Sequence, residues 1–228
     1  MELKRNTLAC LVLIASGLSL SARAADSFNI NVTGVISPAA CEANITGGET
    51  IDYGTIPANK LSADAVTLLP AKQTAFTITC DAPAKVGFRT VDNRSSSKMQ
   101  AGPSIQFDSG SSWNREYLNG LGVDGQGNNI GGWSTEIVSL SSDTVATPAS
   151  IYSTDNGITW VIRGNPFILL SDTGIINTIS TADAVTPAAF STLTGTLTVQ
   201  AVINPASTLD LSQPVTLDGS VTVEMVYL

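Results

Sequence analysis

ADSFNINVTGVISPAAC, at residues 25–41, carries the clearest structural pattern in this chain. Apolar residues or glycine occupy every second position, and mostly polar residues lie between them. This period of two predicts a β-strand with one apolar face. Such a face has to be buried, either in the chain's own domain or in a partner subunit. The apolar face consists of Phe28, Ile30, Val32, Gly34 and Ile36.

The preceding segment, residues 1–24, has the features of a signal peptide. Lys4 and Arg5 form the positively charged n-region, and Leu8–Leu20 is the apolar stretch that follows it. Ala22-Arg23-Ala24 has the small-x-small pattern of a cleavage site. The sequence therefore predicts export. The apolar stretch is too short to span a bilayer and no later stretch reaches that length, so we expect no membrane span.

The charge of the mature chain argues against certain classes of binding partner. The full chain has 11 basic and 19 acidic residues, and cleavage removes three basic and one acidic residue, which leaves 8 and 18. A net charge of −10 argues against nucleic acid and anionic membranes, which attract basic patches. The remaining length of roughly 204 residues suits one large β-domain.

Only two cysteines, Cys41 and Cys80, remain after cleavage. An even pair in an exported chain predicts a disulfide, with two free buried thiols as the weaker alternative. Closing a loop of this length would stabilise the fold by roughly 4 kcal/mol. The chain has no histidine, so neither a metal site nor another cofactor is expected.

Turn residues recur at short intervals along a chain rich in Thr, Val, Ser, Gly and Asn. Many short strands with turns between them predict an all-β antiparallel sandwich. Asp155-Asn156-Gly157 predicts a hairpin turn, because Asn-Gly readily adopts positive φ. The predicted strands are Phe28–Ile36, Thr50–Ile56, Ala75–Cys80, Lys85–Asp92, Ser104–Phe107, Glu136–Leu140, Ile158–Arg163, Thr194–Ile203 and Ser220–Leu228.

The stretch from Ser95 to Trp133 is dense in Ser, Gly and Asn and is interpreted as long surface loops around a short hairpin. Trp113, Tyr117 and Trp133 within it could form a platform on which a sugar stacks. Aromatic side chains that anchor the edge of the sandwich are the more common case.

Nothing in the sequence favours catalysis. Without histidine there is no usual general base, no G-x-S-x-G nucleophile motif is present, and the carboxylates are scattered. We therefore expect a protein that is not an enzyme.

Four segments of the sequence, in their order and spacing, resemble subunits of chaperone–usher fimbriae. The resemblance is closer to a fimbrial-like group of exported proteins that is related to these subunits. The four segments are the N-terminal alternation with Gly34 before Cys41, the segment Thr50–Ile56 with its central glycine, the alternating strand that ends in Cys80, and the strand Ser220–Leu228 with Tyr227 as its penultimate residue. The middle third matches only in general character.

The resemblance implies an immunoglobulin-like sandwich, residues 38–228, that lacks its last strand. A periplasmic chaperone would fill the open groove first, and at an outer-membrane usher the extension of a neighbouring subunit, residues 25–37, would replace it. Main-chain hydrogen bonds would supply the affinity for the added strand, and its alternating side chains would fix its register. Gly34 would fit where the groove is shallow and two backbones approach closely.

The strand Ser220–Leu228 would border this groove and pair with the chaperone, with Val221, Val223, Met225 and Tyr227 on one face. Fimbrial subunits usually have a glycine fourteen residues from the C-terminus, whereas Val215 stands there and Gly219 is the nearest glycine. The resemblance predicts a route through the periplasm to a fimbrium on the surface of a Gram-negative bacterium.

Two other functions remain open. One is a surface adhesin that binds glycan through the loops around Trp113–Trp133. The other is a self-complete fimbrial-like protein whose strand Phe28–Ile36 stays in its own domain, because alternation alone cannot distinguish a donated strand from a retained one.

Overall fold

The computed structural model describes residues 31–35, 39–46, 48–163 and 167–228. The chain divides into two units, residues 1–37 and 38–228. Of the first unit, residues 31–35 are described, and they are exposed and outside any strand. The second unit is an antiparallel β-sandwich, which confirms the predicted fold class. In its described residues the helical segments are single 3₁₀ turns, at residues 58–60, 95–97, 115–117 and 206–208.

The larger sheet has the strand order β1-β3-β13-β8-β11, with β2 added to β13 and β7 added to β8. Its long members β3, β8 and β13 supply most of its pairing, and every pair is antiparallel. The bounds are β1 Cys41–Ile45, β2 Thr67–Leu68, β3 Lys72–Ala84, β7 Asn119–Gly120, β8 Gly131–Ser142, β11 Phe167–Ile168 and β13 Phe190–Ile203.

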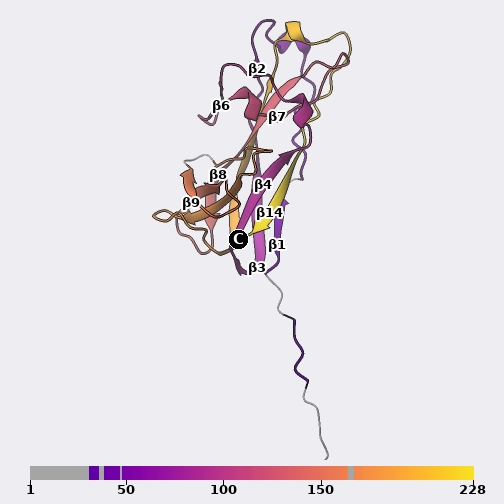
Figure 1. Cartoon of the computed structure of the whole chain (residues 1–228). Coiled ribbons are helices and arrows are strands. Elements are labelled where there is room, and N and C mark those ends of the chain that lie inside the picture. Colours follow the sequence, from indigo (N-terminus) through magenta and orange to yellow (C-terminus); the bar gives the residue numbers. More distant parts are fainter. Residues whose placement is uncertain (1–30, 36–38, 47, 164–166) are drawn as a thin grey trace, which may run out of the picture. The chain divides into compact units, whose positions relative to one another are not determined.

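The smaller sheet has the order β10-β9-β12-β4-β14, so β14 and β10 are its edges. In Figure 1, β14 lies beside β4 and close to β1 of the larger sheet. A separate hairpin pairs β5 with β6. The bounds are β4 Val86–Asp92, β5 Ile105–Gln106, β6 Ser112–Trp113, β9 Pro148–Ser153, β10 Val161–Arg163, β12 Ile176–Thr181 and β14 Val221–Tyr227.

The main core fills the space between the two sheets. Period-2 alternation sends every second residue of β3 and β4 into this space, so Phe76, Ile78, Val86 and Phe88 are buried. Phe88 packs edge-on against Phe76 and Phe167, with ring centroids 6.1 and 5.1 Å apart. The predicted strands that coincide with β3, β4, β13 and β14 are thereby confirmed, and the predicted disulfide joins Cys41 to Cys80.

The turn at Asp155-Asn156-Gly157 is also confirmed. Asn156 and Gly157 have φ of 59° and 87°, and the chain turns there from β9 into β10. Asp155 holds the turn together because its carboxylate accepts hydrogen bonds from the hydroxyls of Ser153 and Thr159. The predicted strand Ile158–Arg163 shortens to β10, and β1, β11 and β12 are among the strands that were not predicted.

Two predictions about the chain's other segments are wrong. Thr50–Ile56 forms no strand, because Gly54 has a φ of 64° and donates its N–H to the Asp52 carboxylate, which bends the segment. The region from Ser95 to Trp133 contains the expected hairpin but is not made of surface loops. It has its own core, formed by Met99, Ile105, Phe107, Trp113 and Leu118 together with Val202 of β13.

Candidate functional site

One edge of β14 has no neighbouring strand among the described residues. Ser220 and Leu228 are paired toward β4, through Asn93 N–H to Ser220 C=O and Leu228 N–H to Lys85 C=O. In an antiparallel strand the backbone groups of successive residues point to opposite edges. The N–H and C=O groups of Val221, Val223, Met225 and Tyr227 therefore point to the free edge.

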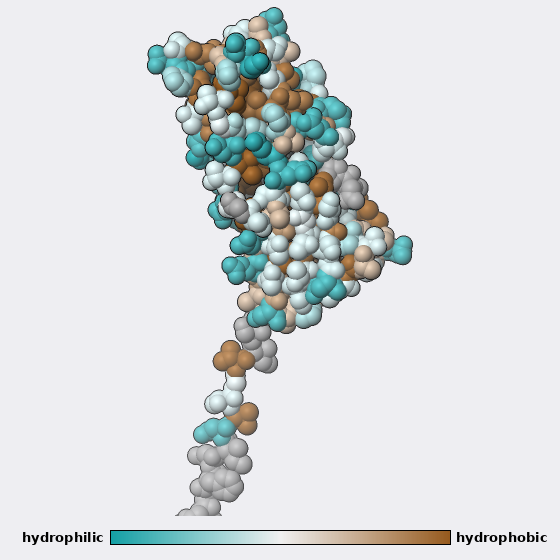
Figure 2. Space-filling model, turned by 180° about the vertical axis from the view of Figure 1, so that it is seen from behind, coloured by the Kyte–Doolittle hydropathy of each residue, from teal (hydrophilic) through white to brown (hydrophobic). Residues whose placement is uncertain are grey.

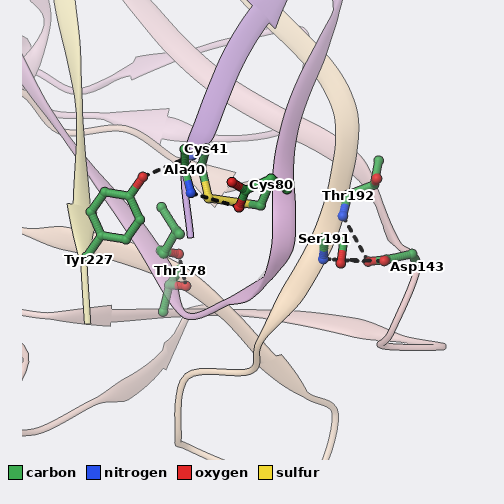
Figure 3. The surroundings of a disulfide bond; sticks show 10 residues. Ala40, Cys41, Cys80, Asp143, Thr178, Ser191, Thr192 and Tyr227 are labelled. Atoms are coloured by element: carbon green, nitrogen blue, oxygen red, sulfur yellow. Dashed lines mark hydrogen bonds between the residues drawn. A yellow bond between two sulfur atoms is a disulfide. The ribbon is translucent and has the colours of Figure 1, made fainter. Parts of the chain in front are cut away.

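The same alternation exposes an edge of β1 in the other sheet. Ala40 pairs toward β3, because its C=O accepts the Asp81 N–H at 3.0 Å and its N–H donates to the Asp81 carboxylate at 2.9 Å. The backbone N–H and C=O groups of Cys41 therefore point away from β3, although its side chain is bonded to Cys80 in β3. The Cys41 N–H donates to the Tyr227 hydroxyl at 2.9 Å, a bond that bridges the two sheets (Figure 3). We call the space between the free edges of β14 and β1 the open side; Tyr227 closes one end of it.

The inner face of β14 is only partly buried. Met225 packs against the main core, whereas Val223 is 42% exposed and Tyr227 is 50% exposed. The outer face has a different character, since Glu224 forms an ion pair with Arg89 at 2.6 Å. The predicted set Val221, Val223, Met225 and Tyr227 thus shares one face, and that face lies along the open side with its apolar side chains incompletely covered.

Beyond the start of β14, the chain borders a cavity of about 810 Å³. One wall is the segment 50–58, and the other is the segment 209–217 that precedes β14. Apart from Ala58, which begins a 3₁₀ turn, both walls lack regular secondary structure. In Figure 2, apolar side chains gather in the upper part of the molecule, the part that carries β2, β6 and β7 in Figure 1. The apolar lining includes Ile51, Ile56, Leu61, Ile130, Ile203, Leu209 and Leu217.

Tyr53 fixes the first wall against β13. Its hydroxyl donates to the Val199 C=O at 3.3 Å and accepts the Ala201 N–H at 3.1 Å. Burial raises the pKa of this phenol, so it stays neutral and can keep both bonds. The segment Thr50–Ile56, which the resemblance predicts to be a strand, borders a cavity instead of pairing in a sheet.

Asp124 fixes the second wall. Its carboxylate accepts the N–H of Gln126 and of Asn128 at 2.9 Å, and the N–H of Asp210 at 2.7 Å. The Asp210 bond comes first among the causes that lower the pKa of Asp124 to about 2. The Asp124 carboxylate is thus occupied by backbone N–H donors of its own turn and of the second wall. No group of three or more His, Cys, Asp or Glu side chains placed to hold a metal ion occurs in the described part of the chain.

The three aromatic residues of the predicted ligand loops do not form an exposed platform. Trp113 is 2% exposed, and its indole N–H donates to the Glu136 carboxylate at 2.8 Å. Trp133 is partly buried, and its indole N–H donates to the Gly120 C=O at 3.0 Å. Tyr117 is 43% exposed. The structure therefore uses both tryptophans to pack the upper part of the sandwich.

The predicted donor strand is only partly within the described residues. Phe28, Ile30 and Ile36 lie outside them. Val32 and Val35 are each 93% exposed, and an added Cβ on Gly34 would meet nothing within 4 Å. Val32, which belongs to the predicted apolar face, and Val35, which lies on the other face, are thus both accessible to a partner.

The disulfide fits a protein exported into an oxidising compartment. Within the described ranges, no helix combines the length and apolar character needed to cross a bilayer. The predicted signal peptide, residues 1–24, lies outside these ranges.

Comparison with known proteins finds one matching family model and similar proteins in Escherichia coli. A family model described as "Protein of unknown function (DUF1120)" matches residues 30–134. The chain is 27% identical over 254 residues to "Protein GltF" of Escherichia coli (strain K12), with both chains covered completely. It is 26% identical over 239 residues to "Uncharacterized protein YhcF" of the same organism, covering 98% of this chain and 100% of the relative. The similarity thus extends over both walls of the cavity and β14.

Proposed function

We propose that this chain is a structural, non-enzymatic subunit of a chaperone–usher surface fibre and that a strand from another chain adds to β14. The observation that carries the proposal is the open side itself. Within the described residues, the strand β14 has no backbone partner along one edge, and Val223 and Tyr227, two of the four side chains on its apolar face, are about half exposed. Unpaired edges of this kind are where strands from other chains add.

The extension supplies a segment that matches this edge. Residues 28–36 place four large apolar side chains and one glycine on one face, and mostly polar residues on the other. A strand added to β14 would direct the first set toward the core and the second toward solvent. In transit through the periplasm, a chaperone strand would occupy the same edge, and assembly at an outer-membrane usher would exchange it for the extension of a neighbouring subunit.

The proposal predicts that the extension binds in trans. A variant that begins at Ala39 is mixed with a synthetic peptide of residues 25–38, and its thermal unfolding is followed by circular dichroism. At a peptide concentration of about 100 times Kd, binding adds about 2.7 kcal/mol to the stability. For a domain of this size that raises Tm by about 5–10 °C.

Two matched variants locate the binding edge. Val223→Asp puts a charge on the inner face of β14 and should abolish the shift in Tm. Thr222→Asp puts the same charge on the outer face and should leave the shift intact. An unchanged Tm with the unaltered domain at saturating peptide would refute the proposal, as would a stable monomeric full-length chain that needs no chaperone and keeps its own extension in place.

A further inference from the structure

A second, smaller cavity of about 310 Å³ shares Tyr53, Ile56 and Leu61 with the cavity of about 810 Å³. Its other residues belong to the segment 55–60 and to the segment 67–72, which runs from β2 into the start of β3. The described residues that line it belong to neither β1 nor β14, so this cavity is separate from the open side. Its volume lies at the lower end of the range for pockets that hold small molecules.

Both walls of this cavity are attached to the same residue of β13. The Ala201 N–H donates to the Tyr53 hydroxyl at 3.1 Å, and the Ala201 C=O accepts the Leu69 N–H at 2.9 Å. The 3₁₀ turn at residues 58–60 is closed by a hydrogen bond from the Lys60 N–H to the Pro57 C=O at 2.9 Å. The cavity is therefore already formed in the folded chain, and a ligand would not have to order its walls.

Two of the eight basic residues of the mature chain line this one cavity, which we call the lysine pocket. They are Lys60, at the end of the 3₁₀ turn, and Lys72, the first residue of β3, whose ammonium nitrogen lies 5.8 Å from the centroid of the Tyr53 ring. The described residues that line the pocket include no Asp or Glu, and the ion pairs within the described ranges involve neither lysine. The pocket is thus a cationic site on a chain that is acidic as a whole, and such a site attracts anions.

The rest of the lining is mainly apolar. Leu61, Leu68 and Pro70 contribute aliphatic surface, and Leu68 is 38% exposed. Thr67 adds a hydroxyl, whose oxygen accepts the Ser62 N–H at 2.9 Å and whose proton is free to be donated to a ligand. Apolar surface beside two ammonium groups complements a molecule that has an apolar body and an anionic group.

We propose that the lysine pocket binds a small organic anion. The anionic group lies near the ammonium groups of Lys60 and Lys72, and the apolar body packs against Leu61 and Leu68. The anionic group is a carboxylate or a phosphate, since an ammonium is a point charge without the planar geometry that distinguishes the two. This inference goes beyond the proposed function, because the ligand takes no part in strand addition.

The first probe is phenylacetate, which joins a carboxylate to an aromatic ring. It is titrated into the full-length chain purified from the periplasm, and the amide chemical shifts are followed by NMR. We expect the signals of Thr55, Leu61 and Leu69 to follow one saturation curve with a Kd on the order of 1 mM, as is usual for so small a ligand. Phenylacetamide has the same ring without the charge and should bind at least about fivefold more weakly. Phenyl phosphate is the second anion, and the tighter of the two anions identifies the preferred group.

Matched variants locate the site at the two lysines. Lys60→Met and Lys72→Met keep the apolar stem of each side chain and remove its charge. Each should weaken the binding of phenylacetate by about fivefold, the upper range for one exposed ion pair, and the double variant by about tenfold or more. Lys85→Met removes an exposed lysine outside the pocket and should leave the Kd unchanged.

Three results would each overturn the inference. The first is that neither anion gives a saturable shift up to about 10 mM. The second is equal affinity for phenylacetate and phenylacetamide, and the third is an unchanged Kd in the double variant. None of these results bears on strand addition, which is tested separately with the peptide of residues 25–38.

Discussion

The region from Ser95 to Trp133 and the open side show opposite relations between regularity and packing. The region has only two-residue strands and 3₁₀ turns before β8, yet Trp113 and Leu118 are almost completely buried in it. The open side is bordered by a regular seven-residue strand, yet two of the apolar side chains on its inner face are about half exposed. The burial of a side chain depends on which surfaces pack against it. An irregular segment can be surrounded by neighbouring segments on all sides, whereas a regular strand at the edge of a sheet has no neighbour on one side.

The buried polar contacts of the region from Ser95 to Trp133 support this contrast. The carboxylate of Glu136, in β8, accepts hydrogen bonds from the Trp113 indole and the Ser111 hydroxyl. Gln200, in β13, donates to the Leu69 C=O and to the Asp108 carboxylate, both at 2.8 Å. The contacts of Glu136 and the bond from Gln200 to Asp108 attach the β5–β6 hairpin to the larger sheet, so the region is an integral part of the sandwich.

The largest expected effect concerns the packed region from Ser95 to Trp133. Trp113→Ala leaves a large cavity and should lower the free energy of unfolding by about 3–5 kcal/mol, measured by urea denaturation. Tyr117→Ala, in the same region but 43% exposed, should cost no more than about 0.5 kcal/mol. A loss from Trp113→Ala as small as that from Tyr117→Ala would show that the packing of Trp113 contributes little to stability.

A smaller effect concerns the closed end of the open side. Tyr227→Phe removes the hydroxyl that accepts the Cys41 N–H, and should cost about 0.5–1.5 kcal/mol. The Cys41 amide should then exchange with solvent faster, which NMR-detected hydrogen exchange can measure. Tyr117→Phe serves as the matched control and should not alter that exchange. Unchanged protection at Cys41 would argue that the bond to Tyr227 does not close the open side.

The smallest effect is a dependence on pH. The pKa of Asp124 and of Asp155 is about 2 in the folded chain, below the ordinary value of 3.8. A lowered pKa contributes stability that is present above about pH 4 and is lost as the pH falls through about 2. Tm should therefore decline between these values.

Asp124→Asn should flatten this decline, because the amide does not titrate. Since the Asp124 carboxylate holds the second cavity wall through the Asp210 N–H, the variant also tests whether that wall limits stability. The measurement is Tm by calorimetry from pH 5 to pH 2. An identical slope in the two proteins would contradict the assignment of the low pKa to Asp124.

Local patterns predicted part of this fold well. Alternation of apolar and polar residues marked β3, β4, β13 and β14. In β3 and β4 the pattern follows from the burial of alternate side chains in the core. The disulfide followed from there being only two cysteines in the mature chain. Asn156-Gly157 predicted its turn because so few residue pairs accept positive φ at both positions.

Other features have no local pattern. The buried positions of Trp113 and Leu118 follow from contacts with Val202 of β13, far away in sequence. Segment 209–217, a wall of the cavity, has neither alternation nor a turn motif that predicts its place. Tyr53 is held in place by hydrogen bonds to β13, and Gly219 lies against Trp133. No spacing of residues in the sequence indicates either of these contacts.

An antiparallel β-sandwich with one disulfide and an alternating extension follows from local properties of the chain, namely strand periodicity, cysteine count and turn chemistry. The position of β14 at the edge of its sheet, the bond from Cys41 to Tyr227 between the two sheets and the packing of Trp133 under Gly219 follow from the three-dimensional arrangement. Each of these depends on which distant strands become neighbours, and pairing between distant strands leaves no periodic signal in the residues that form it.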